Sequence, residues 1–204
     1  MNIQYHNAIA LDLIDEIIAD YDSRDSYETT TMNKSDPGKS LARLHKICEQ
    51  LAERELEYVS GNFYKHSVPY LPHTDYKRYQ DNTLNVVIPL SYTETQPSLV
   101  VFDQIWDLDS VTWSMHYPVQ YFSVNIGVKG CPHEYPVKGL TGQHINSQLY
   151  SKYLNHYPKP CLYGLSGTAY PFSPGSVIMF DNRNIHCTSN FFGEKLGISL
   201  RFRA

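Results

Sequence analysis

The sequence lacks the patterns that mark stapled, secreted or membrane-spanning proteins. No two of its cysteines are spaced as CxxC, so neither a structural zinc site nor a disulfide framework is expected. No run of about 18 apolar residues is present, so we expect no membrane span. Acidic residues interrupt the first apolar stretch, unlike a secretory signal peptide, and we therefore expect a protein of the reducing cytoplasm.

A surplus of basic residues is also missing. The 204-residue chain has 17 Lys and Arg against 21 Asp and Glu, and its formal net charge is −4. Proteins that bind nucleic acid usually carry a basic surplus or stripe, so we predict no nucleic-acid partner. The composition is 42% hydrophobic and 19% charged, which is typical of a folded globular chain. The length suits one core, and we predict a single domain over 1–204.

The hydrophobic pattern changes character about one third of the way along the chain. Residues 7–21 and 40–61 have apolar residues at helical spacing, and we predict two amphipathic helices there. From residue 61 onward, short β-rich runs alternate with turn signals, and we predict strands within them. The runs are 62–71, 83–92, 98–104, 111–115 and 121–128, followed by four C-terminal runs at 162–172, 175–181, 185–191 and 195–202. The expected fold is α+β and mainly β: a sandwich or barrel over 61–204, supported by helices within 1–60 and interrupted by a long insertion at about 104–161.

The stretch "VPYLPHTDYKRY" places His73 and Asp75 two residues apart. With nine His and 21 acidic residues in 204, about one H-x-D/E match is expected by chance. On the motif alone, an ordinary polar loop is therefore favoured over a metal site. In an extended segment the two side chains share one face, as two ligands of one metal must.

The C-terminal segment "PGSVIMFDNRNIHCTSNFFGEKLGISLRF" supplies a partner for this pair. An apolar strand at 176–180 is followed by a polar turn and then by His186. If this run lies beside the His73–Asp75 segment, two imidazoles and one carboxylate converge. That set is the facial triad of non-haem Fe(II) oxygenases, which leaves three coordination positions open.

The last predicted strand carries an arginine on one of its faces. In "GISLRFR" the apolar residues alternate with Ser199, Arg201 and Arg203. A cation on an inward face needs an anion, and the planar fork of Arg201 suits a carboxylate, with the Ser199 hydroxyl beside it. The alternative is an edge strand whose arginines lie in water.

Together these motifs resemble the Fe(II)/2-oxoglutarate-dependent dioxygenase superfamily. The C-terminal segment resembles that of prolyl-4-hydroxylase and phytanoyl-CoA hydroxylase-like members, and "YLPHTD" is similar to the Tyr-x-x-His-x-Asp of prolyl hydroxylases. The similarity covers about 62–103 and 162–203. It implies a double-stranded β-helix, or jelly-roll of cupin type, and an enzyme that hydroxylates a C–H bond while converting 2-oxoglutarate and O₂ to succinate and CO₂.

The resemblance also implies roles for individual residues. His73, Asp75 and His186 would hold Fe(II). Arg201, with Ser199, would bind the C5 carboxylate of 2-oxoglutarate. Two further residues are weaker candidates for that carboxylate: Tyr64, and Arg183 in the turn before His186.

Several alternatives remain open at this point. The substrate is either a small molecule or a peptide segment, and the 104–161 insertion is expected to cover the site and set that choice. A prolyl-type protein hydroxylase is one alternative. A non-catalytic, cupin-like metal-binding module and a plain β-sandwich interaction protein are the others. Cys131 and His133 read as ordinary loop residues, and the sequence predicts no oligomeric state.

Overall fold

The computed structural model describes most of the helical and sheet regions but little of the insertion. The described residues are 3–24, 32, 38–70, 72–75, 83–105, 146–157, 162 and 165–203. The strands predicted at 111–115 and 121–128, the segment 76–79, and most of 104–161 lie outside them. Among the helices in the described ranges, none is long and apolar enough to cross a membrane.

The described elements are mainly strands. In chain order they are β1 (Gln4–Asn7), α1 (Leu11–Ser23), α2 (Gly38–Ala52), β2 (Glu57–His66), β3 (Thr83–Tyr92), β4 (Ser98–Ile105), α4 (Ser147–Leu149), the π-helical turn η1 (Tyr150–Leu154), β5 (Gly167–Pro171), β6 (Ser176–Asp181), β7 (Asn184–Thr188) and β8 (Lys195–Arg203). The predicted runs at 83–92 and 98–104 correspond closely to β3 and β4. Each of the four C-terminal β-rich runs contains a strand.

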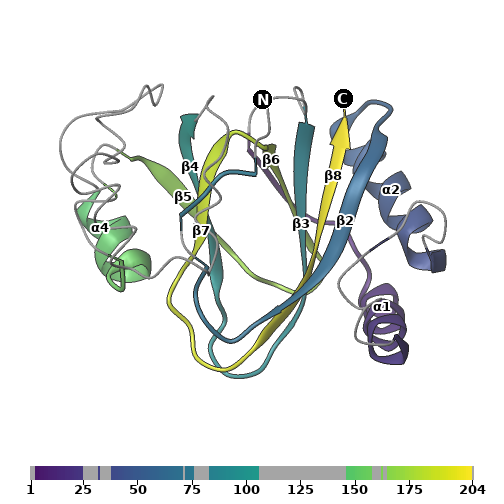
Figure 1. Ribbon diagram of the computed structural model, residues 1–204, viewed down its shortest axis with the longest axis horizontal. Helices are drawn as coiled ribbons and strands as arrows, with labels where there is room; N and C mark the ends of the chain where they lie inside the picture. The colour runs from purple at the N-terminus through teal and green to yellow at the C-terminus, as the bar shows by residue number, and fades with distance from the viewer. Residues whose placement is uncertain are drawn as a thin grey trace.

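The strands form two antiparallel sheets. The larger sheet has the order β1-β6-β3-β8-β2, and the smaller has the order β5-β4-β7. Consecutive strands change sheet where β6 turns into β7 (Figure 1). The two segments that carry the C-terminal motif therefore lie in opposite sheets.

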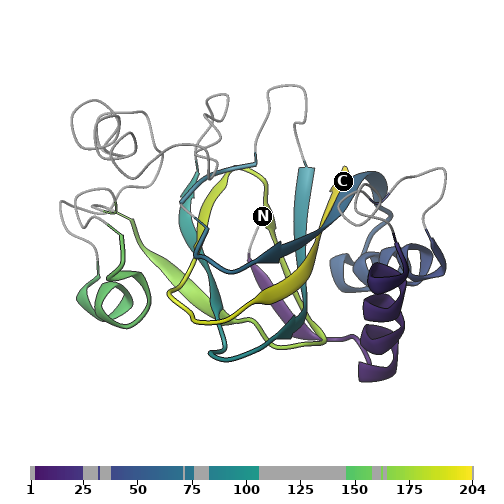
Figure 2. The same cartoon turned by 60° about the horizontal axis from the view of Figure 1, so that its bottom comes forward.

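Helices α1 and α2 cover the outer face of the larger sheet, as Figures 1 and 2 show. Their apolar stripes, which include Ile17 and Leu44, pack in one cluster with Ile198, Leu200 and Phe202 of β8. The alternation predicted for the last strand is confirmed, because these three residues are fully buried while Ser199 and Arg201 face the other way.

The space between the sheets contains a second apolar cluster. Val87 of β3 and Phe180 of β6 meet Leu99 and Val101 of β4 there. On the outer face of the smaller sheet, a third cluster joins β4 and β7 to the segment 146–165. The site described below therefore lies between two sheets whose outer faces are both covered. Packing on these outer faces holds the two sheets that form its walls.

The first 60 residues are less helical than the sequence predicted. Helix α2 ends at Ala52, not near residue 61, and Glu53 has a φ of 54°, a left-handed conformation typical of helix ends. Strand β2 begins at Glu57 because that segment pairs with the whole of β8. Strand β1 was also not predicted, and its four residues pair with β6. In both cases tertiary strand pairing overrides local preference.

Candidate metal and co-substrate site

His73 and His186 are joined through their backbones. The amide of His73 donates to the carbonyl of His186 over 2.9 Å, and the amide of His186 donates to the carbonyl of His73 over 2.8 Å. Their ring centroids lie 4.1 Å apart, and both residues are buried. A loop and a strand that are distant in sequence thus present two imidazoles side by side.

The Asp75 side chain reaches the two imidazoles from the same loop that carries His73. Its amide donates to the carbonyl of Asn182 over 3.2 Å, which ties the loop to the β6–β7 turn. Its carboxylate accepts a 2.7 Å hydrogen bond at Oδ2 from the Asn85 side chain, and its Oδ1 lies 3.3 Å from Nη2 of Arg201. The carboxylate is therefore held from the larger sheet while it faces the two histidines.

The three predicted ligands converge. One ligand atom from each of His73, Asp75 and His186 lies within 4.8 Å of the other two. Nδ1 of His186 is 3.1 Å from the carbonyl oxygen of Asn184, so Nδ1 carries the proton and donates it there. Nε2 of His186, 3.7 Å from Asp75 Oδ2, is then the unprotonated nitrogen that a metal requires.

Electrostatics keeps these groups in the protonation states that bind metal. Burial lowers the pKa of His186 and outweighs the nearby carboxylate, so the imidazole is neutral. Burial acts to raise the pKa of Asp75, but Arg201 and the two histidines outweigh it and hold the pKa well below its usual range. A neutral imidazole and an ionised carboxylate are the forms that coordinate a divalent cation.

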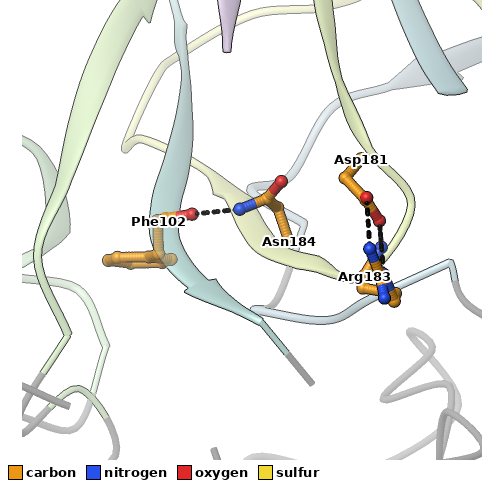
Figure 3. Close-up of polar contacts among 4 residues, drawn as sticks. All are labelled: Phe102, Asp181, Arg183 and Asn184. Atoms are coloured by element: carbon orange, nitrogen blue, oxygen red, sulfur yellow. Dashed lines mark hydrogen bonds and ion pairs between the residues drawn. The ribbon is translucent and has the colours of Figure 1, made fainter. Parts of the chain in front are cut away.

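The β6–β7 turn that carries His186 is fixed by side-chain contacts (Figure 3). Asp181 accepts two 2.8 Å hydrogen bonds from the guanidinium of Arg183, and Asn184 donates over 2.8 Å to the carbonyl of Phe102 on β4. Arg183, a rival for the co-substrate carboxylate on sequence grounds, is thus paired with Asp181 within its own turn.

A cavity of about 220 Å³ opens next to the three ligands, between the sheets. Its walls include His66 and Tyr70, whose rings are stacked 5.2 Å apart, and Tyr70 packs edge-on against His73 at 4.6 Å. Ser199 and Arg201 of β8 also line the cavity, as the sequence predicted for an inward face. Tyr64 lines it as well, and burial raises the pKa of its phenol.

Lys195 lies in the same wall and was not singled out from the sequence. Its side chain is buried, and Nζ donates a 2.8 Å hydrogen bond to Oγ1 of Thr188. Nζ is also 5.3–5.6 Å from the ring centroids of Tyr64, Phe172 and Phe191. Burial lowers the pKa of Lys195 to about 7. Within the described residues no carboxylate forms an ion pair with this ammonium, which makes it a ready site for an anion.

Two residues of this site were therefore missed, and both carried a weak signal. Lys195 shares its strand face with Ser199 and Arg201 at even spacing, and that spacing was the signal that could have found it. Asn85 is the one amide in the apolar run "TLNVVIPL" and is 1% exposed. A polar side chain within a buried strand indicates a buried partner.

No protein-family model and no curated protein sequence matches the chain. Solved structures do match the chain. The non-haem α-ketoglutarate-dependent epimerase SnoN from nogalamycin biosynthesis superposes with a TM-score of 0.57, at 10% identity over 98% of this chain and 78% of SnoN. HygX from Streptomyces hygroscopicus, with nickel and 2-oxoglutarate bound, gives 0.54 at 13% identity, over 98% of this chain and 82% of HygX.

The chain has the fold of Fe/2-oxoglutarate-dependent enzymes. One SnoN structure is a complex with Fe³⁺, α-ketoglutarate and nogalamycin RO, and a HygX structure holds iron. The similarity of fold extends over nearly the whole chain, whereas the sequence motifs covered only two segments of it.

Proposed function

We propose that the protein is a non-haem Fe(II)- and 2-oxoglutarate-dependent oxygenase that hydroxylates a C–H bond, with the two-sheet core as its double-stranded β-helix. The convergence of His73, Asp75 and His186 at one end of a cavity carries the proposal. Two imidazoles and one carboxylate are the donor set that Fe(II) takes in such enzymes. The shared fold supports this assignment.

Each group of the site has a distinct part in this function. His73, Asp75 and His186 would hold the iron, and the cavity that they line would receive the 2-oxo acid. When bound, iron and 2-oxoglutarate supply the oxidising chemistry, in which O₂ and 2-oxoglutarate yield succinate, CO₂ and one oxygen atom for the substrate. The aromatic and imidazole rings of His66 and Tyr70 restrict water beside the metal.

We assign the distal carboxylate of 2-oxoglutarate to Lys195 in place of Arg201. Lys195 is buried without a carboxylate partner in the described residues, whereas Arg201 already contacts Asp75. Thr188, which anchors Lys195, is two residues from His186 on the same face of β7, a spacing of about 7 Å. That spacing suits a five-carbon dicarboxylate with one end at the metal. Tyr64 and Ser199 line the cavity between these points.

A non-catalytic metal-binding module is the alternative from another class. A structural metal site needs no buried ammonium next to it, because an unpaired buried cation costs free energy. Lys195 therefore favours an enzyme over a structural module. The substrate remains either a small molecule or a peptide segment. SnoN is an epimerase, so the same fold hosts more than one outcome of 2-oxoglutarate-dependent chemistry.

The decisive test is an anaerobic titration. The apoprotein is mixed with Fe(II) and then with 2-oxoglutarate, and a weak visible charge-transfer band is expected as the 2-oxo acid chelates the metal. On admission of O₂, slow formation of succinate is expected even without substrate. Asp75→Ala is expected to lose both signals while keeping its far-UV circular dichroism. Folded wild-type protein that gives neither band nor succinate refutes the proposal.

A further inference from the structure

The inward-facing residues of strand β8 become more exposed toward its C-terminal end. Lys195, where the strand starts, is buried, whereas the side chain of Arg201 is 23% exposed and that of Arg203 is 51% exposed. Residues two apart on a strand share one face, and Lys195 and Arg201 both line the cavity. The cavity is therefore closed at Lys195 and open toward Arg201, and its two cations lie at opposite ends.

Arg201 has polar neighbours on both adjacent strands. The register of the larger sheet puts it opposite Asn85 of β3 and opposite Ser60 of β2, so the three side chains leave the same face of the sheet. Asn85 is buried and donates to Oδ2 of Asp75 over 2.7 Å, whereas Ser60 is partly exposed. The side of the guanidinium toward β2 is therefore the more open one.

The guanidinium uses little of its hydrogen-bonding capacity within the described residues. Its one polar contact there joins Nη2 to Oδ1 of Asp75 at 3.3 Å, which is long for a charge-assisted hydrogen bond. A guanidinium has five N–H donors in a planar fork, and that fork fits a carboxylate through two parallel hydrogen bonds. Arg201 can therefore hold a second anion while it still contacts Asp75.

The charges around the cavity leave one cation for such an anion. Among the described residues that line it, Asp75 is the only carboxylate, and Lys195 and Arg201 are the only lysine and arginine. Fe(II) and the dianion of 2-oxoglutarate cancel each other's charge, and Asp75 offsets one of the two cations. We propose that Arg201 binds a carboxylate of the substrate, so that the protein acts on a carboxylic acid.

This inference rests on the proposed function and names the class of substrate for the same site. Arg201 Nη2 is 3.3 Å from one oxygen of Asp75, and the other oxygen is 3.7 Å from Nε2 of His186. An acid group on the guanidinium therefore lies beside the ligand atoms, and the carbon chain that bears it lies next to the metal position, as hydroxylation requires. A small organic acid and the carboxylate of a peptide supply the same group.

Matched acids and amides test this inference without turnover. Wild type is loaded anaerobically with Fe(II) and saturating 2-oxoglutarate, which occupies the Lys195 end, and is then titrated with 3-phenylpropionate or 3-phenylpropanamide. The charge-transfer band and isothermal titration calorimetry report binding. The acid is expected to bind about tenfold more tightly than the amide, because hydrogen bonds to charged groups are the stronger ones.

The source of the carboxylate is distinguished by a second pair, an acetylated dipeptide that ends in phenylalanine and its C-terminal amide. Tighter binding of the dipeptide acid than of 3-phenylpropionate indicates a peptide, and the reverse order indicates a small acid. Either order supports the inference, provided that each acid binds more tightly than its own amide. Equal binding of acids and amides in wild type overturns it.

Variants assign the preference to Arg201. Arg201→Met is expected to bind acid and amide equally while its 2-oxoglutarate affinity stays close to that of wild type. Ser60→Asp places a competing carboxylate opposite Arg201 without altering Arg201 or Asp75, and it is expected to weaken acid binding, whereas the uncharged Ser60→Asn is expected to match wild type. The Ser60 variants decide the question where Arg201→Met fails to load Fe(II).

Two further outcomes are kept apart by the same titrations. A loss of 2-oxoglutarate affinity in Arg201→Met overturns the inference and assigns Arg201 to the co-substrate. Wild type that gives no charge-transfer band with Fe(II) and 2-oxoglutarate defeats the proposed function, whereas a normal band with no preference for acids defeats this inference alone.

Discussion

His73 and His186 exchange both of their backbone hydrogen bonds, at 2.9 and 2.8 Å, although 112 residues separate them in the chain. This bridge joins the loop that carries His73 to strand β7, and it places a loop imidazole against a strand imidazole. Backbone pairing therefore brings the two imidazoles together.

Asn85→Ala is expected to weaken metal binding without unfolding the protein. The substitution removes the 2.7 Å hydrogen bond to Asp75 Oδ2, the oxygen near His186. Loss of a contact that orients a metal ligand typically lowers metal affinity by about 10- to 100-fold. Calorimetric titration with Co(II) measures this change. Asn62→Ala, on β2 of the same sheet and also lining the cavity, is the matched control and is expected to bind Co(II) normally.

Lys195→Met is expected to impair 2-oxoglutarate binding and to leave the metal in place. Removing one partner of a buried charged contact usually costs at least about 2 kcal/mol, which corresponds to roughly a 30-fold weaker affinity. Pyruvate, a 2-oxo acid without the distal carboxylate, is expected to bind wild type and variant alike. Lys65→Met, which removes an exposed lysine paired with Glu194, serves as the control. Equal 2-oxoglutarate affinity in wild type and Lys195→Met would remove Lys195 from the site.

The low pKa of Lys195 predicts two pH dependences of opposite sign. Burial lowers this pKa from 10.5 to about 7, and the groups facing the ammonium are Tyr64, His66 and Cys187. Above pH 7 the free folded protein loses the proton that an anion needs. Its affinity for 2-oxoglutarate is then expected to fall up to about tenfold per pH unit.

Unfolding restores the ordinary pKa, so between pH 7 and 10.5 the unfolded chain binds more protons than the folded chain. The contribution of Lys195 to stability is therefore expected to rise with pH over this window. Isothermal titration and urea unfolding across the range measure the two slopes. Lys195→Met is expected to abolish both pH dependences. Lys195→Arg is expected to keep a positive charge over the whole pH range. An affinity for 2-oxoglutarate that stays constant from pH 7 to 9 in wild type would contradict the assignment.

Tyr157→Phe is expected to loosen the loop that carries His73 and Asp75. The buried Tyr157 hydroxyl lies 2.6 Å from the carbonyl of Tyr70 and 2.8 Å from that of Thr188, and so it links the loop before His73 to β7. The carbonyl of Tyr70 still accepts from the amide of Thr188 over 3.0 Å, so the variant loses hydrogen bonds without leaving that acceptor bare. Loss of one such hydrogen bond costs about 0.5–1.5 kcal/mol. Thermal unfolding is expected at a lower temperature, with weaker Co(II) binding. Tyr153→Phe, in the same segment, is the comparison. A variant as stable as wild type would show that the hydroxyl does not hold the loop.

Much of the β-core was predictable because its signals are local. The apolar runs of β3, β4, β6 and β8 are bounded by turn residues, and period-two alternation placed Ser199 and Arg201 on the inward face. The same local reasoning failed at α2, which it extended to about residue 61. Pairing between β2 and β8 decides that boundary, and pairing partners are not visible in a local window.

The sequence by itself determined which residues were available for metal chemistry: an H-x-D pair, a distal histidine and inward cations on the last strand. Only the tertiary structure decided how they are used. Antiparallel pairing puts Arg201 opposite Asn85 and against Asp75, while Lys195 is buried among aromatic rings without a carboxylate partner in the described part of the chain. Distances between segments far apart in the chain, and the desolvation of one ammonium, arise only when two sheets close around the same cavity.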